Sequence, residues 1–319
     1  MPVVTETLRA REMAKAIEDC FGIRVETCRR DITGWDNFVL EVNHRYIFRF
    51  PRFRASLGSL KRELGILPDL AEALTTPVPR YEWVWRGGRE HRGWFAGYRK
   101  IPGVPLTAGG YRRAWEKRLA PSLSSFLREL HGLDPGRLGA SKVPRYPPKE
   151  TRNWARATHR KAVELVYPLL DGPTKAESER FWAGMLEEFD RADFVPVIVH
   201  GDLTSRNILL DQATHRVTGV LDWAGSAVGD PGMDFAGTFE VNRSLGEAVL
   251  RGYGKEGEAL RRRIDYYTRV IPFFEIIWGV TQNSEAYKAD GMRRIRRRLG
   301  TNFVELGGQT HTQALKQKV

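Results

Sequence analysis

Residues Val197–Leu210 read VIVHGDLTSRNILL. The apolar run Val197–Val199 predicts a short buried strand, which ends in a His-Gly-Asp turn that carries Asp202. Asn207 follows Asp202 by five positions and stands directly before a second apolar run. The pattern indicates a polar loop between two buried strands, a place where folds present functional side chains.

A short hairpin after this loop returns a second carboxylate. The sequence predicts its turn at Asp211–Arg216 and its returning strand at Val217–Leu221, with Asp222 at the strand end. Asp202, Asn207 and Asp222 are therefore expected at the ends of neighbouring strands, facing one cleft. One carboxylate can accept a proton from a hydroxyl, while an amide oxygen and a second carboxylate suit Mg²⁺. Phosphoryl transfer uses these same components.

The chain before this region predicts a small α+β unit. A helix at Leu8–Cys20 precedes three strands, and a helix at Ser59–Leu74 precedes two more. The five strands are expected at residues 25–30, 38–42, 46–50, 80–84 and 93–100. Ile101–Pro105 breaks this pattern and predicts a hinge, and most of the chain beyond it is helical. We expect an N-terminal lobe over residues 1–100 and a helical C-terminal lobe over residues 101–319.

Several motifs occur in a familiar order. His-Gly-Asp, then Asn, then Leu-Asp-Trp, then GDPGMD at Gly229–Asp234 resembles the antibiotic phosphotransferases, the small-molecule branch of the protein-kinase-like fold. YIFRFP at Tyr46–Pro51 and GYRKIPGVPLT at Gly97–Thr107 narrow the resemblance to the aminoglycoside 2''-phosphotransferases. The likeness runs from about Arg24 to at least Gly237. It implies an α+β, bilobal protein-kinase-like fold with a five-stranded antiparallel N-lobe and a mainly helical C-lobe.

The resemblance assigns roles to residues of the loop His200–Asn207, called the central loop below, and to Asp222. It implies that Asp202 is the catalytic base and that Asn207 and Asp222 are the magnesium ligands. We expect His200 to be architectural, with its imidazole bonded to backbone or to the Asp222 strand. Three further residues are expected to be structural: Asp230, Asp234 and Trp223. Each short motif alone fits an ordinary turn, and only their joint order and spacing favour a kinase-like site.

The resemblance also locates the nucleotide. Asp31–Asn37 lies where a kinase fold places its phosphate-covering loop, and Gly34 is its one glycine. By motif alone this is an ordinary hairpin turn. Tyr98, Lys100 and Ile101 belong to the segment against which the purine is expected to lie. The 2''-type relatives use GTP, and some use ATP as well, so the sequence favours neither donor.

Arg49 departs from the family, which usually carries Lys on this third strand. Strand alternation places Arg49 on the face opposite Phe48 and Phe50, and Glu63 on the following helix is placed to pair with it. Arg keeps the positive charge, yet its fork is longer and differently shaped than an ammonium group. The alternative interpretation is a solvated strand residue without a role in nucleotide binding.

An aminoglycoside is a polycation and requires an acidic pocket. In the resembled family the C-terminal helices line the acceptor cleft, which suggests Glu240, Glu275 and Trp278 as acceptor residues. An internal salt bridge to one of the many arginines is an equally good interpretation of Glu275. Trp278 fits the core better than a sugar-stacking role. A macrolide or a metabolite hydroxyl also remains open as the acceptor, as does a nucleotide-binding homologue with little catalytic activity.

The composition excludes several classes of protein. The chain has 319 residues, of which 41% are hydrophobic and 28% charged, which suits a globular protein with a core. Its most apolar stretch, Val270–Val280, is interrupted by Glu275 and is too short to cross a bilayer. Two cysteines, Cys20 and Cys28, fit a reducing compartment. We expect a cytoplasmic monomer without a membrane partner.

The net charge of +12 is the one unusual bulk property. A basic balance favours phosphate-bearing partners in general, but a solvated basic surface is the simpler interpretation. The densest basic runs, Arg261–Arg263 and Arg293–Arg298, lack the interleaved aromatics of a single-strand binding platform. We therefore expect a nucleoside triphosphate and a hydroxyl-bearing small molecule as ligands, and no nucleic acid.

Overall fold

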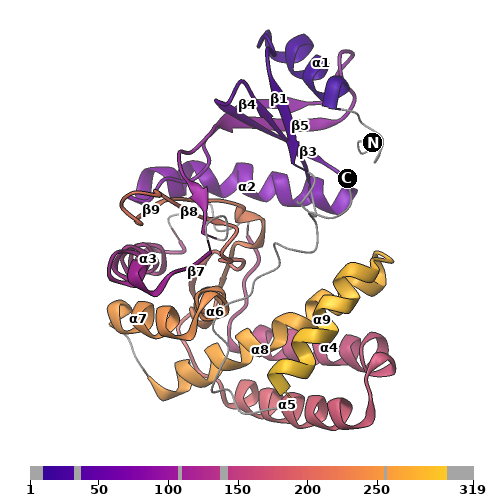
Figure 1. Ribbon diagram of the computed structural model, residues 1–319, viewed down its shortest axis with the longest axis vertical. Helices are drawn as coiled ribbons and strands as arrows, with labels where there is room; N and C mark the ends of the chain where they lie inside the picture. The colour runs from indigo at the N-terminus through magenta and orange to yellow at the C-terminus, as the bar shows by residue number, and fades with distance from the viewer. Residues whose placement is uncertain (1–9, 32–36, 107–109, 137–142, 255–256, 300–319) are drawn as a thin grey trace.

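The computed structural model describes residues 10–31, 37–106, 110–136, 143–254 and 257–299. Over these residues the chain forms two lobes, an N-terminal lobe built on a five-stranded sheet and a mainly helical C-terminal lobe (Figure 1). The α+β, bilobal fold predicted from the sequence is confirmed. Gly34, predicted to approach the nucleotide, lies outside the described residues.

The N-terminal sheet is antiparallel throughout, with the strand order β1-β2-β3-β5-β4. Its strands are β1 (Cys28–Asp31), β2 (Asn37–Val42), β3 (Tyr46–Pro51), β4 (Tyr81–Arg86) and β5 (Trp94–Arg99). Helix α1 (Ala10–Phe21) covers one face, and its buried Met13 and Ile17 share an apolar cluster with Phe48 and Phe50. Because side chains alternate along β3, Arg49 between these phenylalanines points to the opposite face.

The first strand begins at Cys28, three residues later than predicted. The backbone N–H groups of Glu26 and Thr27 donate to the side-chain oxygen of Asn43, at 2.9 and 3.0 Å, instead of to a neighbouring strand. Asn43 itself lies in the turn before β3 with a φ of 51°, a conformation that Asn tolerates. The Asn43 side chain thus accepts the hydrogen bonds of two backbone N–H groups that the alternating sequence pattern assigned to strand pairing.

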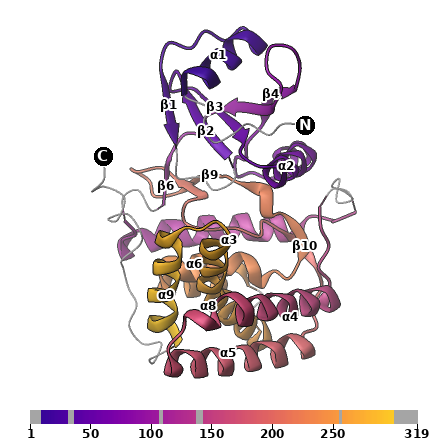
Figure 2. The same cartoon turned by 90° about the vertical axis from the view of Figure 1, so that its right-hand side faces the viewer.

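Helix α2 (Arg54–Ala73) begins five residues before the predicted start and joins the two lobes. Its buried Ile66, Leu67 and Leu70 belong to an apolar cluster composed mainly of residues from the C-terminal lobe. The helix accordingly lies between the sheet and the C-terminal lobe (Figures 1 and 2). Its position is therefore fixed by the core that also carries the central loop.

The predicted hinge contains one short strand. After β5, Val104–Pro105 forms β6, which pairs with β8 (Ile208–Leu210), so the chain regains regular structure sooner than Ile101–Pro105 indicated. Gly103 makes this possible, since its φ is +123° and a Cβ there would lie 2.3 Å from Thr218 Oγ1.

The C-terminal lobe combines two apolar clusters with short strands. Its described helices are α3 (Glu116–Gly132), α4 (Pro148–Leu165), α5 (Gly172–Arg191), α6 (Gly232–Val241), α7 (Arg243–Tyr253), α8 (Glu258–Thr281) and α9 (Glu285–Leu299). One cluster joins α3, α6 and α7 to the strands, and the other joins α4, α5, α8 and α9. Among the described residues no helix is long and apolar enough to cross a bilayer.

Four short strands position the central loop. Besides β8, these are β7 (Val197–Val199), β9 (Val217–Val220) and β10 (Ala227–Gly229). β8 and β9 form the predicted hairpin, while β7 pairs with β10. The loop after β7 and the turn after β9 thus emerge side by side, as the apolar pattern indicated.

Candidate active site

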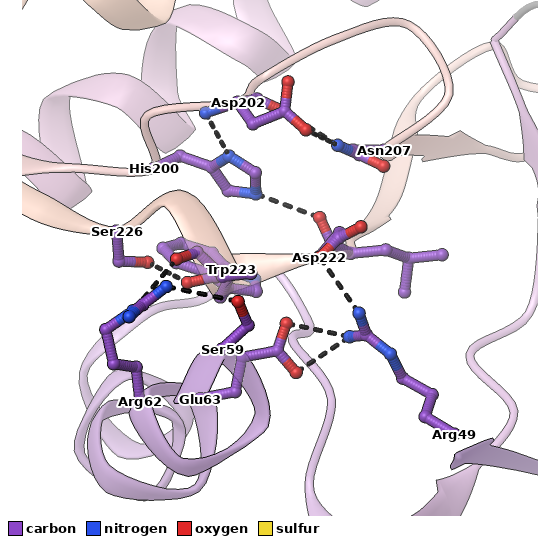
Figure 3. Close-up of polar contacts among 12 residues, drawn as sticks. Arg49, Ser59, Arg62, Glu63, His200, Asp202, Asn207, Asp222, Trp223 and Ser226 are labelled. Carbon is purple, nitrogen blue, oxygen red and sulfur yellow. Dashed lines mark hydrogen bonds and ion pairs between the residues drawn. The ribbon is translucent and has the colours of Figure 1, made fainter. Parts of the chain in front are cut away.

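The loop after β7 presents Asp202 and Asn207 together. The Asn207 side-chain amide donates from Nδ2 to the Asp202 backbone oxygen at 2.8 Å and to its carboxylate at 3.1 Å. Gly201 permits the sharp exit from the strand, since its φ is +77° and a Cβ would lie 2.2 Å from the Gly225 backbone oxygen. The amide is consequently held with Oδ1 directed away from Asp202 (Figure 3).

His200 ties this loop to the strand that leads to Asp222, as predicted. The imidazole is fully buried, accepts at Nδ1 from the Asp202 N–H at 3.1 Å, and donates from Nε2 to the Leu221 carbonyl oxygen at 2.9 Å. Burial lowers the pKa of His200. The neutral ring therefore bridges the two backbone segments and acts as a structural link.

Asp234, at the start of α6, binds the backbone at the beginning of the loop that carries Asp202. Its buried carboxylate accepts from the backbone N–H groups of His200 and Gly201, at 2.9 and 2.8 Å, and contacts His131 Nε2 at 3.1 Å. Burial alone would raise the pKa of Asp234, but the hydrogen bond and charge of His131 hold it below its usual range. An ionised acceptor thus fixes the backbone that carries Asp202.

Asp230 and Trp223 are also structural, as the sequence predicted. The buried Asp230 carboxylate pairs with Arg263 of α8 at 2.6 Å and accepts from the Gly232 N–H at 2.9 Å. The Trp223 ring is fully buried, and its indole N–H donates to the Val220 carbonyl oxygen at 3.0 Å. Both side chains anchor the segment between β9 and α6.

Asp222 occupies an unusual backbone conformation. Its φ and ψ are 62° and 72°, in the left-handed region that only a few non-glycine residues adopt. Its carboxylate accepts from Arg49 Nη2 at 3.0 Å. Burial works to raise the pKa of Asp222, but the Arg49 charge and hydrogen bond hold it below its usual range. Asp222 therefore stays ionised and faces the N-terminal lobe.

Arg49 forms the predicted pair with Glu63 and extends it to the C-terminal lobe. Its Nη1 lies 2.8 Å from both Glu63 carboxylate oxygens, while Nη2 reaches Asp222 (Figure 3). The Tyr81 hydroxyl donates to Glu63 at 2.6 Å. Arg49 and Glu63 are 7% and 1% exposed, which contradicts the alternative of a solvated strand residue. The two ends of the guanidinium fork each hold a carboxylate, a geometry that a lysine ammonium lacks.

The Asp202 carboxyl reaches solvent and has a strongly shifted pKa. Desolvation by the surrounding protein, followed by the nearby charge of Asp222, raises the pKa of Asp202 to about 7. The Asn207 hydrogen bond acts in the opposite direction. A carboxylate with a pKa near neutrality suits proton transfer at physiological pH.

Asp222 and Asn207 carry donors suited to a magnesium ion bound with phosphates. No cluster of three or more His, Cys, Asp or Glu side chains in the described part of the chain has the arrangement of a metal site. Mg²⁺ with nucleotides commonly uses only one or two carboxylates and takes its other ligands from phosphate and water. One carboxylate and one oriented amide oxygen fit that chemistry.

The residues predicted to contact the purine lie at the junction of the lobes. Tyr98, in β5, is buried and packs edge-on against Tyr81, with ring centroids 5.3 Å apart. Ile101 is nearly buried, and a Cβ at Gly219 would lie 2.6 Å from it. The Lys100 ammonium instead pairs with Glu41 of β2 at 3.0 Å. The sequence did not indicate that last pairing.

The residues predicted to bind the acceptor are engaged in ion pairs or packing. Arg294 of α9 pairs with both Glu240 and Glu275, and Arg298 pairs with Glu240. The salt-bridge interpretation of Glu275 is thus correct, and Arg294 holds Glu240 as well. Burial raises the pKa of Glu275 to about 7, against the charge of Arg294. Trp278 is partly buried on α8.

Comparisons with known proteins identify the family of this chain. Residues 27–267 match the family described as "Phosphotransferase enzyme family". The chain belongs to this family. A curated relative of this phosphotransferase is viomycin phosphotransferase of Streptomyces vinaceus, 26% identical over 283 residues that cover 82% of this chain and 91% of the relative.

Solved structures of other phosphotransferases share the fold. A GDP and kanamycin complex of an APH(2'') enzyme superposes with a TM-score of 0.83 at 21% identity, covering 92% of this chain and all of that one. A macrolide 2'-phosphotransferase of type I gives a TM-score of 0.70 at 20% identity, covering 92% and 99% of the two chains. The resemblance predicted from the sequence is confirmed at the level of family, fold and enzyme class.

Proposed function

We propose that this phosphotransferase transfers the γ-phosphate of GTP or ATP to a hydroxyl of an aminoglycoside-type antibiotic. The single observation that carries this proposal is the convergence of Asp202, Asn207 and Asp222 beside the buried Arg49–Glu63 pair (Figure 3). We infer that these side chains supply a base, oxygen ligands for a metal ion and a cation for the phosphates at one junction between the lobes. The relatives, which include viomycin and aminoglycoside phosphotransferases, support the reaction class.

Asp202 is the proposed catalytic base. Its carboxylate accepts the proton of the acceptor hydroxyl, and its pKa of about 7 keeps a useful fraction ionised at neutral pH. The Asn207 amide and the His200 ring fix the loop, so the carboxylate is oriented before substrate arrives. Catalysis by positioning of this kind matches phosphoryl transfer, where the protein contributes mainly orientation and charge.

Asn207 and Asp222 would hold Mg²⁺, which neutralises phosphate charge when it is bound. Arg49 pairs with Glu63 and reaches Asp222 across the lobe junction, and we propose that its second nitrogen also binds the α- and β-phosphates. We propose that Tyr98, Lys100 and Ile101 border the purine. GDP in an APH(2'') neighbour supports a guanine nucleotide as one donor.

The acceptor has a second candidate. Glu240 of α6, together with Glu275 and Trp278 of α8, are the proposed contacts for an aminoglycoside, yet Arg294 and Arg298 already neutralise the two carboxylates. This pairing favours an acceptor with fewer positive charges, such as a macrolide. The fold neighbours include enzymes for both kinds of antibiotic.

A turnover assay tests the proposal. Purified protein, Mg²⁺ and GTP or ATP are incubated with kanamycin, viomycin, a macrolide and no acceptor, and product is detected by mass spectrometry. We expect one acceptor to gain a single phosphate, and Asp202→Asn to reduce kcat by at least about 100-fold while nucleotide affinity is retained.

Asp193→Asn is the matched control, because Asp193 is an exposed aspartate that precedes β7 outside the site. It should keep wild-type turnover. Tight nucleotide binding with no turnover on any acceptor would instead support a nucleotide-binding homologue, and equal turnover by Asp202→Asn would remove the proposed base.

A further inference from the structure

The turn that carries Asp222 is held by a second arginine from the N-terminal lobe. Arg62 of α2 donates from Nε to the Ala224 carbonyl oxygen at 3.3 Å, and its Nη2 donates to Ser59 Oγ at 3.2 Å (Figure 3). Ala224 stands two residues after Asp222 in the same short 3₁₀ turn, Trp223–Gly225. The contact therefore joins helix α2 to the backbone that sets the direction of the Asp222 carboxylate.

This backbone needs external support. The left-handed region is uncommon for a residue other than glycine, so neighbouring contacts help to hold Asp222 at its φ of 62°. His200 fixes the Leu221 carbonyl on one side of Asp222. Arg62 fixes the Ala224 carbonyl on the other side. The strained residue is thus clamped between one hydrogen bond from each lobe.

Helix α2 provides a rigid base for this clamp. One turn beyond Arg62, Ile66 and Leu67 are buried in the cluster that also contains Leu203 of the central loop and Trp223 of the Asp222 turn. Ser59, which is 7% exposed, fixes the far end of the Arg62 guanidinium. Because Ser59 holds the Arg62 guanidinium in one orientation, the Nε–H of Arg62 defines one position for the Ala224 carbonyl oxygen.

We propose that Arg62 is a positioning residue that aims the Asp222 carboxylate at the divalent cation. It acts through the backbone of the turn, whereas Arg49 acts on the carboxylate itself. The inference rests on the proposed function, since it requires Asp222 to be a metal ligand. It predicts that loss of Arg62 weakens metal binding selectively and leaves the nucleotide pocket intact.

The experiment measures Mn²⁺ affinity by electron paramagnetic resonance in the presence of GDP, using the full chain. Arg62→Ala should weaken the apparent Mn²⁺ affinity about tenfold, the usual effect of removing a residue that orients a metal ligand. Arg62→Lys, which can still donate one hydrogen bond to the Ala224 oxygen, should recover part of the affinity. The affinity for GDP without metal should stay within about twofold of wild type.

Lys61→Ala is the matched control. Lys61 is the neighbouring exposed cation on α2, and its ammonium lies 4.7 Å from the Trp94 ring centroid, away from the Asp222 turn. Unchanged Mn²⁺ affinity in Arg62→Ala overturns the proposal, as does an equal loss in Lys61→Ala. A parallel loss of GDP affinity and melting temperature would show a general structural role and also overturns it. If wild-type protein binds neither GDP nor ATP with Mn²⁺, the proposed function itself fails.

Discussion

Replacement of Arg49 by Met should cost about 3 kcal/mol of folding stability. Arg49 and Glu63 are almost completely buried and share two 2.8 Å contacts. Removing one partner of such a pair leaves an uncompensated charge, which typically costs about 3–5 kcal/mol. The lower end of this range applies because the Tyr81 hydroxyl still donates to Glu63. Urea unfolding without nucleotide, followed by tryptophan fluorescence, measures the loss.

The loss should also depend on pH. Burial already raises the pKa of Glu63, and Arg49 opposes that shift, so Arg49→Met raises the pKa further. A carboxyl whose pKa is higher in the native state than in the unfolded chain binds its proton preferentially when folded. The variant therefore regains stability as the pH falls, and its deficit should be smaller at pH 5 than at pH 8.

Two comparisons make this prediction refutable. Arg49→Met combined with Glu63→Gln should recover at least half of the lost stability, because the fully buried Glu63 carboxylate is then gone and only the more exposed Asp222 has lost its partner. Arg99→Met removes an exposed ion pair with Glu82 on the same sheet and should cost less than about 1 kcal/mol. A loss for Arg49→Met no larger than that of Arg99→Met, or a loss that is the same at pH 5 and pH 8, would refute the reasoning.

Three further predictions concern the site. Since the Asp202 pKa is raised to about 7, kcat/KM should increase with pH up to about 7 and then level off. Because the ionised Asp202 carboxylate is disfavoured in the folded protein, Asp202→Asn should melt at a higher temperature than wild type at pH 8 but not at pH 4. Arg294→Gln removes the partner of Glu275 and one of the two partners of Glu240, so it should increase kcat/KM for kanamycin about tenfold relative to a macrolide, whereas Arg293→Gln should leave this ratio unchanged; a constant ratio in both variants places the cluster away from the acceptor. Gly237→Ala places a Cβ 1.9 Å from the Leu203 carbonyl oxygen, so it should lower both the melting temperature and turnover, and wild-type values for both would show that α6 and the loop can separate.

The sequence was sufficient to predict the architecture and the main site contacts. Apolar runs of strand length around Asp202 and Asp222 indicated two adjacent strand ends, and the structure places β7 and the β8–β9 hairpin there. Alternation along β3 indicated the face on which Arg49 lies, and the family resemblance indicated Glu63 as its partner; the two residues form a buried pair. These predictions succeeded because side-chain periodicity and short connections fix which residues share a face or an edge.

The sequence patterns did not predict the polar contacts between residues that lie far apart in the chain. Nothing in the local pattern indicates that Arg62 reaches Ala224, that Lys100 pairs with Glu41, or that Arg294 of α9 holds two carboxylates from α6 and α8. Arginine is abundant in this chain, so each acidic residue has many candidate partners, and the composition does not show which pair forms.

Apolar contacts can be predicted from the sequence and ion pairs cannot, for a physical reason. Hydrophobic burial acts on every apolar residue and leaves a periodic trace in the sequence, whereas an ion pair forms only when the packed helices bring two particular side chains within reach. The sequence by itself therefore determined the family, the lobes and the neighbouring strand ends that carry Asp202, Asn207 and Asp222. Only the tertiary structure decided the direction of Asp222 and the charge balance of Glu240 and Glu275.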